Sequence, residues 1–294
     1  MDLGLYLGIG LTWNPWRVPD ENFKWKKETA EKLQKDIDDI KPTKETGLDK
    51  FRVLTVGLYG HGKSSLINSF ASISVGEKTS ICNAASMGTN VTTHYRNFDF
   101  PGQLEQIVLS DISGLPVKKD VHPYVENIKL ILQGHIKHGY MFNPEKSISS
   151  EEKDYESSPK FSDRIHCVLI VIDSTMAYEL PAAFVYGVKR IMETMHSMNI
   201  PVIAVLTKTD KLSPHVKYSV ESIFRCRKIQ QAVQNVSKQL EIPAPKIYPV
   251  VTFEEMDHFT WRESIPLLIV LKSLLLVAKM HSRNAIEVAQ KKDN

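Results

Sequence analysis

Residues 51–65 read FRVLTVGLYGHGKSS, an apolar run followed by a glycine-rich turn and the start of a predicted helix. Gly57, Gly62, Lys63 and Ser64 match the spacing G-x-x-x-x-G-K-S/T. Glycines let successive backbone N–H groups point into one concavity, and the following helix directs its positive end at the same anion. A chance match in a turn is the alternative. The strand before and the helix after favour a phosphate-binding loop.

The composition is that of a soluble globular protein. The chain has 294 residues, 42% hydrophobic and 24% charged, which allows one large α/β domain with appendages. The net charge of +3 is too small to argue for nucleic acid or an anionic membrane. The three cysteines form no C-x-x-C pair, which is typical of a reducing compartment. We therefore expect a cytoplasmic protein that binds no nucleic acid.

Residues 1–50 are predicted to be an N-terminal segment and docking helix. Residues 1–11 are apolar but lack the features of a signal peptide, so we expect residues 1–18 to be an extended segment anchored by Trp13 and Trp16. An arm that touches a membrane is the alternative. A helix is predicted over 20–41, capped by Asp20 or Asn22.

Residues 51–290 are predicted to form one α/β domain. Strands are expected at 51–57, 91–100, 106–110, 166–173, 201–206 and 246–251, and helices at 63–72, 121–138, 180–198, 216–240 and 263–290. This alternation implies a mostly parallel, doubly wound sheet, and the hairpin over 91–110 adds one antiparallel edge strand. Residues 139–164 are polar and are predicted to be a flexible surface insertion. The apolar run at 266–277 is short and contains Lys272, which favours a buried helix over a transmembrane segment.

Two further motifs follow predicted strands, at the edge where such sheets bind ligands. Asp111 and Gly114 form D-x-x-G, in which the carboxylate holds Mg²⁺ through water and the glycine N–H senses a γ-phosphate. Thr207, Lys208 and Asp210 belong to the sequence TKTD, whose carboxylate accepts hydrogen bonds from guanine N1–H and its amine. Adenine lacks that donor pair, so the site would discriminate against it. A Lys/Asp turn at a strand end is the alternative interpretation.

Together these motifs resemble those of the GTPase superfamily over residues 51–255, which implies a P-loop NTPase G domain. The opening GKSSLIN, residues 62–68, is similar to the branch with dynamin-like and septin-like proteins. A closer resemblance, over about 13–280, is to the interferon-induced protein 44 family. It is carried by PWR at 15–17, the helix after it, GH at 134–135 leading to FNP at 142–144, and DRIHC at 163–167. This resemblance implies a short form, without the additional N-terminal domain, of a cytoplasmic GTP-binding protein of the interferon and antiviral response.

The expected ligands are GTP or GDP with Mg²⁺, and Ser64, Thr93 and Asp111 are the expected metal ligands. Thr92 or Thr93 is favoured over Thr89 as the switch residue. Residues 251–253 come at the end of the last predicted strand, and by this position alone we assign them to the loop that packs behind the base. The full set of expected nucleotide contacts is Gly57, Gly60, His61, Gly62, Lys63, Ser64, Ser65, Thr92, Thr93, Asp111, Gly114, Thr207, Lys208 and Asp210.

Hydrolysis is expected to be slow. Gly114 is followed by Leu115, where many small GTPases carry a glutamine that orients water, and unassisted hydrolysis runs on the order of 10⁻⁴ per second. His61 is either a catalytic substitute or, as we favour, a loop filler. A pair of histidines, His135 and His138, is not expected to bind metal without a third ligand.

Three hypotheses remain open on sequence alone. The first is a slow switch in which residues 79–95 and 114–140 move, and the second is a scaffold that holds nucleotide without hydrolysing it. A dynamin-like machine is disfavoured, because about 40 residues follow the last strand, too few for a long stalk. Self-association across the nucleotide face, or effectors at the switch loops, are the candidate partnerships.

Overall fold

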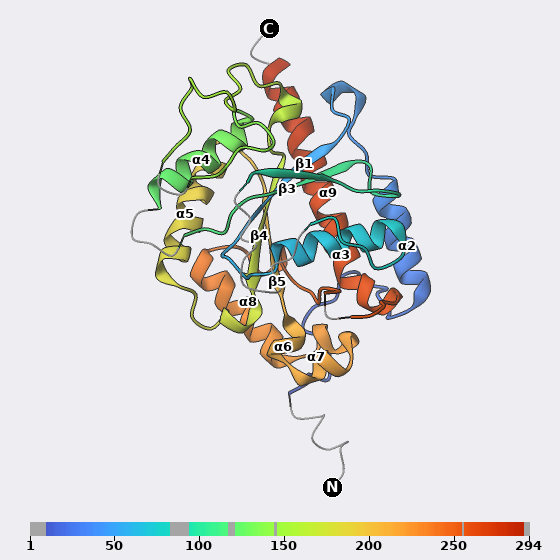
Figure 1. The fold of residues 1–294 in the computed structure, drawn as a ribbon. Helices are drawn as coiled ribbons and strands as arrows, with labels where there is room; N and C mark the ends of the chain where they lie inside the picture. Colours follow the sequence, from blue (N-terminus) through green and yellow to red (C-terminus); the bar gives the residue numbers. More distant parts are fainter. Residues whose placement is uncertain (1–9, 83–93, 117–120, 144–145, 255, 291–294) are drawn as a thin grey trace.

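In the computed structural model, residues 10–82, 94–116, 121–143, 146–254 and 256–290 are described, and they form an α/β fold (Figure 1). Within these residues, six strands make one sheet in the order β2-β3-β1-β4-β5-β6. All neighbouring strands are parallel except β2, which runs antiparallel to β3 at the edge. The predicted sheet and its antiparallel edge are thus confirmed. The strands are β1 Phe51–Val56, β2 Arg96–Asp99, β3 Ile107–Asp111, β4 Cys167–Asp173, β5 Val202–Thr207 and β6 Ile247–Pro249.

Helices cover both faces of this sheet, as Figure 1 shows, with α4, α5 and α8 on one side and α2, α3 and α9 on the other. The described helices are α2 Lys27–Asp38, α3 Lys63–Val75, α4 His122–Gln133, α5 Ala182–Ser197, α6 Thr209–Leu212, α7 Pro214–Tyr218, α8 Arg227–Leu240 and α9 Trp261–Gln290. Short 3₁₀ turns lie at Lys44–Thr46, Phe161–Asp163, Ser174–Met176, Val220–Phe224 and Ala244–Lys246.

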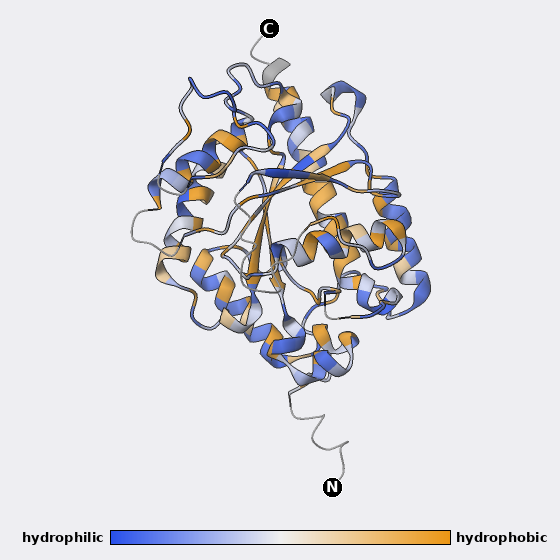
Figure 2. Ribbon diagram, viewed as in Figure 1, coloured by the Kyte–Doolittle hydropathy of each residue, from blue (hydrophilic) through white to orange (hydrophobic). Residues whose placement is uncertain are grey.

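Strand β4 shows why the sheet sits in the middle. Every residue of β4 is buried, and side chains alternate between the two layers. Val168, Ile170 and Ile172 contact the core under α4 and α5, whereas Leu169 and Val171 contact the core under α3 and α9. A strand buried on both faces needs a continuous apolar run. Figure 2 shows this as orange along the central strands, while the helices also carry blue residues.

The closing helix α9 passes behind the sheet and packs against α2. By length and composition, its segment Trp261–Val288 is apolar enough to cross a membrane. Core helices of globular proteins pass the same test, and 56% of the most apolar window is buried inside the protein. Lys272 Nζ lies 2.7 Å from Asp36 Oδ2 of α2, so the charge inside the apolar run has a partner. This is the buried helix that the sequence predicts.

The single long helix predicted over 216–240 is wrong. The chain there forms α7, a 3₁₀ turn and then α8, with extended backbone at Ser219 and Cys226. Because the chain bends at these points, Val220 and Phe224 are buried with the partly buried Trp16. Tertiary packing of these apolar groups outweighs local helix propensity.

The N-terminal segment is anchored by one of its two predicted tryptophans. The Trp16 indole Nε1 donates to the Ile223 carbonyl at 3.2 Å, and its ring meets Phe224 edge-on. Trp13 is 95% exposed, so its predicted anchoring role is wrong. Helix α2 also begins later than predicted, after Lys26, and no side chain caps it. Residues 1–9 lie outside the described part of the chain.

The predicted insertion at 139–164 has several fixed points in its described part. The Asn127 amide of α4 donates to the Lys146 carbonyl at 3.1 Å, and Ile148 N–H donates to Asn127 Oδ1 at 2.9 Å. Ile148 is buried, and Tyr155 stacks on His135 with ring centroids 5.1 Å apart. His135 lies beyond the end of α4, in a loop, rather than on the predicted helix. The flexibility of this segment stays a prediction.

Candidate nucleotide-binding site

The glycine-rich loop leaves β1 at Val56 and enters α3 at Lys63, as the motif requires. Gly62 adopts a φ of +87°, which side-chain-bearing residues rarely adopt. Gly57 is required for a different reason, since a Cβ there would lie 2.3 Å from the Val171 carbonyl oxygen of β4. The two glycines therefore bring the loop against the sheet and direct the first N–H groups of α3 outward, where an anion binds.

Lys63 is buried beneath this loop. Its side chain is 7% exposed, and Nζ donates to the carbonyls of Gly57 and Leu58, each at 3.3 Å. Burial lowers the Lys63 pKa, and the charge of Asp111 opposes that shift. Within the described part of the chain, this buried ammonium has two long hydrogen bonds, both to backbone carbonyls. It is well suited to a phosphate, which would supply stronger charge-assisted hydrogen bonds.

Asp111 and Ser64 form a pair of oxygen groups beside Lys63. Ser64 Oγ lies 3.5 Å from Asp111 Oδ2, and Thr55 Oγ1 donates to Asp111 Oδ1 at 3.1 Å. Burial raises the Asp111 pKa, although Lys63 and the hydrogen bonds from Thr55 and Ser64 act against it. A hydroxyl and a buried carboxylate at this spacing are the hard oxygen donors that Mg²⁺ prefers, so the residues present fit the metal.

Cys82 also reaches this pair, and sequence reasoning missed it. Its Sγ lies 3.9 Å from Asp111 Oδ2, and Asn68 Oδ1 accepts a hydrogen bond from the Cys82 N–H at 2.8 Å. Burial raises the pKa of the Cys82 thiol to about 11, so it is a neutral neighbour of Asp111 and Ser64. No spacing rule connects it to Asp111, since the contact depends on how residues 76–82 fold back along α3.

Gly114 packs directly on the phosphate loop. A Cβ at Gly114 would lie 2.3 Å from the Tyr59 backbone nitrogen, and the Leu115 N–H donates to the Gly57 carbonyl at 3.0 Å. The D-x-x-G segment and the loop are therefore in backbone contact. The Leu115 side chain is 2% exposed and points to α5, where it lies over Gly187.

The His61 ring faces the protein interior. Its Nδ1 lies 3.1 Å from the Val171 carbonyl, and its ring meets Phe184 edge-on at 5.4 Å. Its Nε2 is buried and has no hydrogen-bond partner among the residues that the structure describes. Burial lowers the His61 pKa to about 4, so the ring is neutral at pH 7. Both nitrogens are shielded from a nucleotide in this arrangement. The geometry supports the filler role that the sequence favoured and does not support the catalytic alternative.

The TKTD segment follows β5 and contacts the phosphate loop. Thr207 Oγ1 donates to the His61 carbonyl at 2.7 Å. Lys208, at a φ of +55°, donates from Nζ to the Gly60 carbonyl and to Asp173 Oδ2, each at 2.6 Å. Its stem therefore lies across the gap between β4 and the loop. The role of this stem in covering a base stays a prediction.

Asp173 is a second residue that sequence reasoning missed. Burial alone would raise its pKa, but hydrogen bonds from Lys208 and Thr175 outweigh burial and lower it. The carboxylate is thus ionised and holds the Lys208 ammonium in place. The available signal was its position, because Asp173 ends β4 at the same sheet edge as the three motifs.

A small hollow of about 30 Å³ lies between these parts. It is lined by Gly62, Ser65, Lys208, Asp210, Lys211, Thr252 and Glu254. Asp210, the predicted base-selecting carboxylate, and Thr252, from the predicted base-backing loop, therefore share one wall. Glu254 was not anticipated; its carboxylate accepts a hydrogen bond from the Ser65 hydroxyl.

The remaining predicted nucleotide contacts either lie outside the described residues or belong to the phosphate loop itself. Thr92 and Thr93, predicted to close on Mg²⁺ and the γ-phosphate, and the alternative Thr89, lie outside the described residues. Gly60 adopts a φ of +76° in the loop and accepts the hydrogen bond from Lys208.

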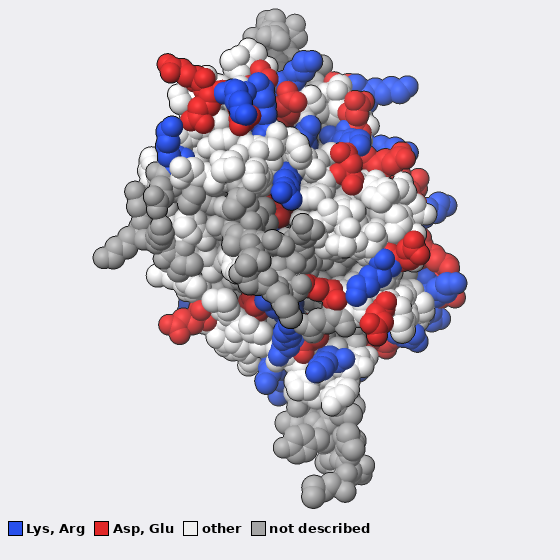
Figure 3. All heavy atoms as spheres, in the orientation of Figure 1, with Lys and Arg blue, Asp and Glu red and all other residues white. Residues whose placement is uncertain are grey.

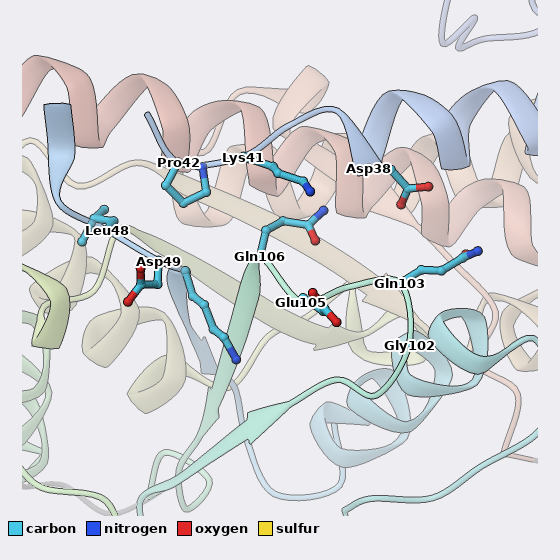
Figure 4. Close-up of a pocket in the computed structure, with 10 residues that line it drawn as sticks. Asp38, Lys41, Pro42, Leu48, Asp49, Gly102, Gln103, Glu105 and Gln106 are labelled. Atoms are coloured by element: carbon cyan, nitrogen blue, oxygen red, sulfur yellow. The ribbon is translucent and has the colours of Figure 1, made fainter. Parts of the chain in front are cut away.

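A larger hollow, of about 600 Å³, lies at the other end of the strands, where β1 and β3 begin (Figure 4). Its walls come from the end of α2, the loop before β1 and the turn before β3, and include Asp38, Lys41, Asp49, Glu105 and Gln106. None of the predicted nucleotide contacts lines it. Size therefore does not identify the site here; the convergence of the motifs does.

The charged side chains visible in Figure 3 do not form one basic patch on that face. On the face in Figure 3, acidic and basic side chains are interspersed around the rim. Two lysines at the site, Lys63 and Lys208, make their contacts within it. The expectation that the protein binds no nucleic acid stays a prediction.

The fold and the motifs are those of a GTPase domain, and comparison with known proteins agrees. The family model described as 50S ribosome-binding GTPase matches residues 52–208, which run from β1 through Lys208. The chain belongs to this GTPase family. Family membership accounts for the phosphate loop, the D-x-x-G segment and the beginning of the TKTD segment.

The full-length relatives are more specific. Interferon-induced protein 44-like of Homo sapiens is 30% identical over 256 residues, 86% of this chain and 56% of its own length. Interferon-induced protein 44 of Homo sapiens is 27% identical over 235 residues, 79% of this chain and 53% of its own length. The recognised resemblance is thus confirmed, and the chain spans about half the length of the curated relatives it matches.

A solved structure was also found, titled as that of a probable GTP-binding protein engB. It aligns with a TM-score of 0.43 at 14% identity, covering 78% of this chain and 98% of that one.

Proposed function

We propose that this protein binds GTP with Mg²⁺ in a guanine-selective site and hydrolyses it slowly as a switch. The observation that carries the proposal is the contact between Lys208 and Gly60 at 2.6 Å. It joins the base-selecting segment to the phosphate loop, so the groups for the two ends of one nucleotide lie side by side. Membership of a GTPase family supports the same ligand.

Each part of the site has a role in this proposal. Lys63 and the first N–H groups of α3 bind the phosphates, and Asp210 selects guanine. Ser64 and Asp111 would hold Mg²⁺, and the ion, when bound, neutralises charge on the phosphates. Asp173 keeps Lys208 across the base side. The switch threonine, Thr92 or Thr93, stays a prediction.

Slow turnover is proposed from the groups beside Gly114. Leu115 carries no polar atom that could orient water, and its side chain contacts α5. The His61 ring is shielded as well. A G domain that has its glutamine but no activating partner hydrolyses GTP on the order of 10⁻⁴ per second, so we expect a rate no higher than that here.

A scaffold that binds nucleotide without hydrolysing it is the second candidate, favoured by the same burial of Leu115. Fluorescent GTP, GDP and ATP, titrated with and without Mg²⁺, test the shared part of both proposals. We expect guanine-selective binding, enhanced by Mg²⁺ and lost in Lys63→Ala and Asp210→Ala. Lys189→Ala and Asp99→Ala are matched controls, because both residues lie in exposed ion pairs.

A single-turnover assay then separates the two candidates. The switch predicts a measurable rate near the unassisted value, whereas the scaffold predicts none. Equal affinity for ATP, or binding that survives both site substitutions, would reject the guanine-nucleotide proposal altogether.

A role in the interferon and antiviral response, in the cytoplasm, is proposed from the relatives named above. The unpaired thiols of Cys82, Cys167 and Cys226 are consistent with a reducing compartment. Protein abundance before and after interferon treatment, with the location of a tagged chain, tests both statements. Self-association across the nucleotide face, and effectors at the switch loops, are proposals that the same tagged chain can examine by co-purification.

A further inference from the structure

The hollow between the motifs is narrow, with about 30 Å³ of space for water-sized groups. Glu254 is one of the residues that line it. A nucleotide that enters the hollow therefore meets the Glu254 side chain.

Gly62 is fixed between β1 and α3, and Lys208 is tied to both Gly60 and Asp173. Glu254 lies on an exposed loop after β6, and its backbone carbonyl accepts a hydrogen bond from Lys78. Its carboxylate is brought into the wall by the hydrogen bond from Ser65. The Glu254 side chain can therefore leave the wall when that one side-chain contact breaks.

The position of that contact gives Glu254 a direct effect on the ligand. Ser65 lies in the first turn of α3, and its side chain is 7% exposed. The first turn of this helix is where the phosphates bind, because its N–H groups and dipole favour negative charge. The Glu254 carboxylate therefore occupies, with its own negative charge, space beside the phosphate end of the site.

We propose that Glu254 is a built-in competitor of the nucleotide, held by Ser65 until the nucleotide displaces it. This inference rests on the proposed function and adds a regulation of that same site. Its carboxylate lowers the affinity of the site for phosphorylated ligands through charge, and its side chain lowers it further by filling the entrance.

The same loop is connected to the segment that leads toward the predicted switch. Lys78 Nζ donates to the Glu254 carbonyl at 3.2 Å and also to the Met256 carbonyl. Lys78 lies between the end of α3 and Cys82, which itself contacts Asp111. Displacement of Glu254 therefore acts on the segment that carries Lys78, and this segment leads to Cys82 beside Asp111.

The test compares binding of GTP, GDP and guanosine to the full chain and to three variants. Glu254→Gln keeps the size of the side chain and removes its charge, whereas Glu254→Ala removes both. Glu77→Gln is the matched control, since Glu77 is an exposed carboxylate one residue from Lys78. Thermal unfolding of each variant verifies that it is folded.

We expect Glu254→Gln to bind GTP and GDP about three- to tenfold more tightly at low salt, with the gain shrinking as salt screens the charge. Guanosine, which has no phosphate, should change less than about twofold in this variant. Glu254→Ala should bind all three ligands more tightly, and Glu77→Gln should match the unaltered chain.

The outcomes separate this inference from the proposed function. If the unaltered chain binds GTP and Glu254→Gln binds it equally well or more weakly, the competitor role is wrong and the GTP site stands. If neither the unaltered chain nor any variant binds a guanine nucleotide, both proposals fail. Binding that appears only in the two Glu254 variants would support the competitor role in its strongest form.

Discussion

Leu115 lies in a notch on α5 that exists because residue 187 is glycine. A Cβ at Gly187 would be 2.8 Å from Leu115 Cδ1 and 3.0 Å from Cδ2, so no larger residue fits without a shift. The residue that follows the D-x-x-G motif is therefore packed into the protein rather than directed at the nucleotide. Its backbone N–H is at the same time bound to Gly57 of the phosphate loop.

This packing predicts that restoring a glutamine will not restore fast hydrolysis. In Leu115→Gln, the amide would enter an apolar notch, which costs about 1–3 kcal/mol of the free energy of unfolding when its hydrogen bonds are unmet. We expect a single-turnover rate within about threefold of the unaltered chain, together with a lower denaturation midpoint. A rate increase of tenfold or more would show that the side chain at 115 does reach the attacking water.

His61→Ala separates packing from catalysis at the phosphate loop. The substitution removes the contacts with Phe184 and the Val171 carbonyl, so we expect the free energy of unfolding to fall by about 1–3 kcal/mol. The single-turnover rate, measured well below the unfolding temperature, should change by less than about threefold. A tenfold loss of rate with an unchanged unfolding curve is the result that would reinstate a catalytic His61.

Lys63→Met is expected to affect binding and stability in opposite directions. Nucleotide affinity should fall at least about a hundredfold, because a buried charge on the phosphates is lost. The free protein should be as stable as the unaltered chain or more stable by up to about 1 kcal/mol, because a buried ammonium is replaced by an apolar group of similar length. Chemical denaturation without nucleotide, paired with a binding titration, measures both. A large loss of stability would mean that Lys63 is chiefly structural.

Two buried histidines predict destabilisation in mild acid. Burial lowers the pKa of His61 to about 4 and of His166 to about 3, below the ordinary value of 6.5. The unfolded chain therefore binds more protons than the folded chain once the pH drops below 6.5. Stability from these groups is fully present above that pH and is lost as the pH falls toward 4.

Each histidine contributes a slope of up to about 1.4 kcal/mol per pH unit in this window. Denaturation midpoints measured between pH 7 and pH 4 test the slope, and His61→Ala should reduce it by one residue's share. A stability that is flat across this window would show that neither histidine opposes protonation in the folded state.

The two N-terminal tryptophans form a matched pair. Trp16 contacts Phe224 and donates to the Ile223 carbonyl, so Trp16→Ala should lower the free energy of unfolding by about 2–4 kcal/mol. Trp13 is 95% exposed, and Trp13→Ala should change it by less than about 0.5 kcal/mol. Equal losses would mean that Trp13 has a contact among residues outside the described part of the chain.

Much of the fold and part of the site could be read from local patterns. Continuous apolar runs identified β4 and β5, because strands buried on both faces must be apolar throughout. The position of Lys63 at the start of α3 followed from a fixed spacing. The break between α7 and α8 did not follow, since it depends on how Phe224 packs with Trp16, more than 200 positions away.

The amino-acid sequence by itself determined the α/β class, the parallel sheet with its antiparallel edge, and the three motifs that gather at one end of it. These features depend on side-chain periodicity and on short spacings, which act within a few residues of chain. Tertiary structure alone decided that His61 faces the core, that Leu115 enters the notch at Gly187, and that Glu254 meets Ser65, 189 positions away. Such contacts depend on the packing of several elements at once, and no local pattern encodes them.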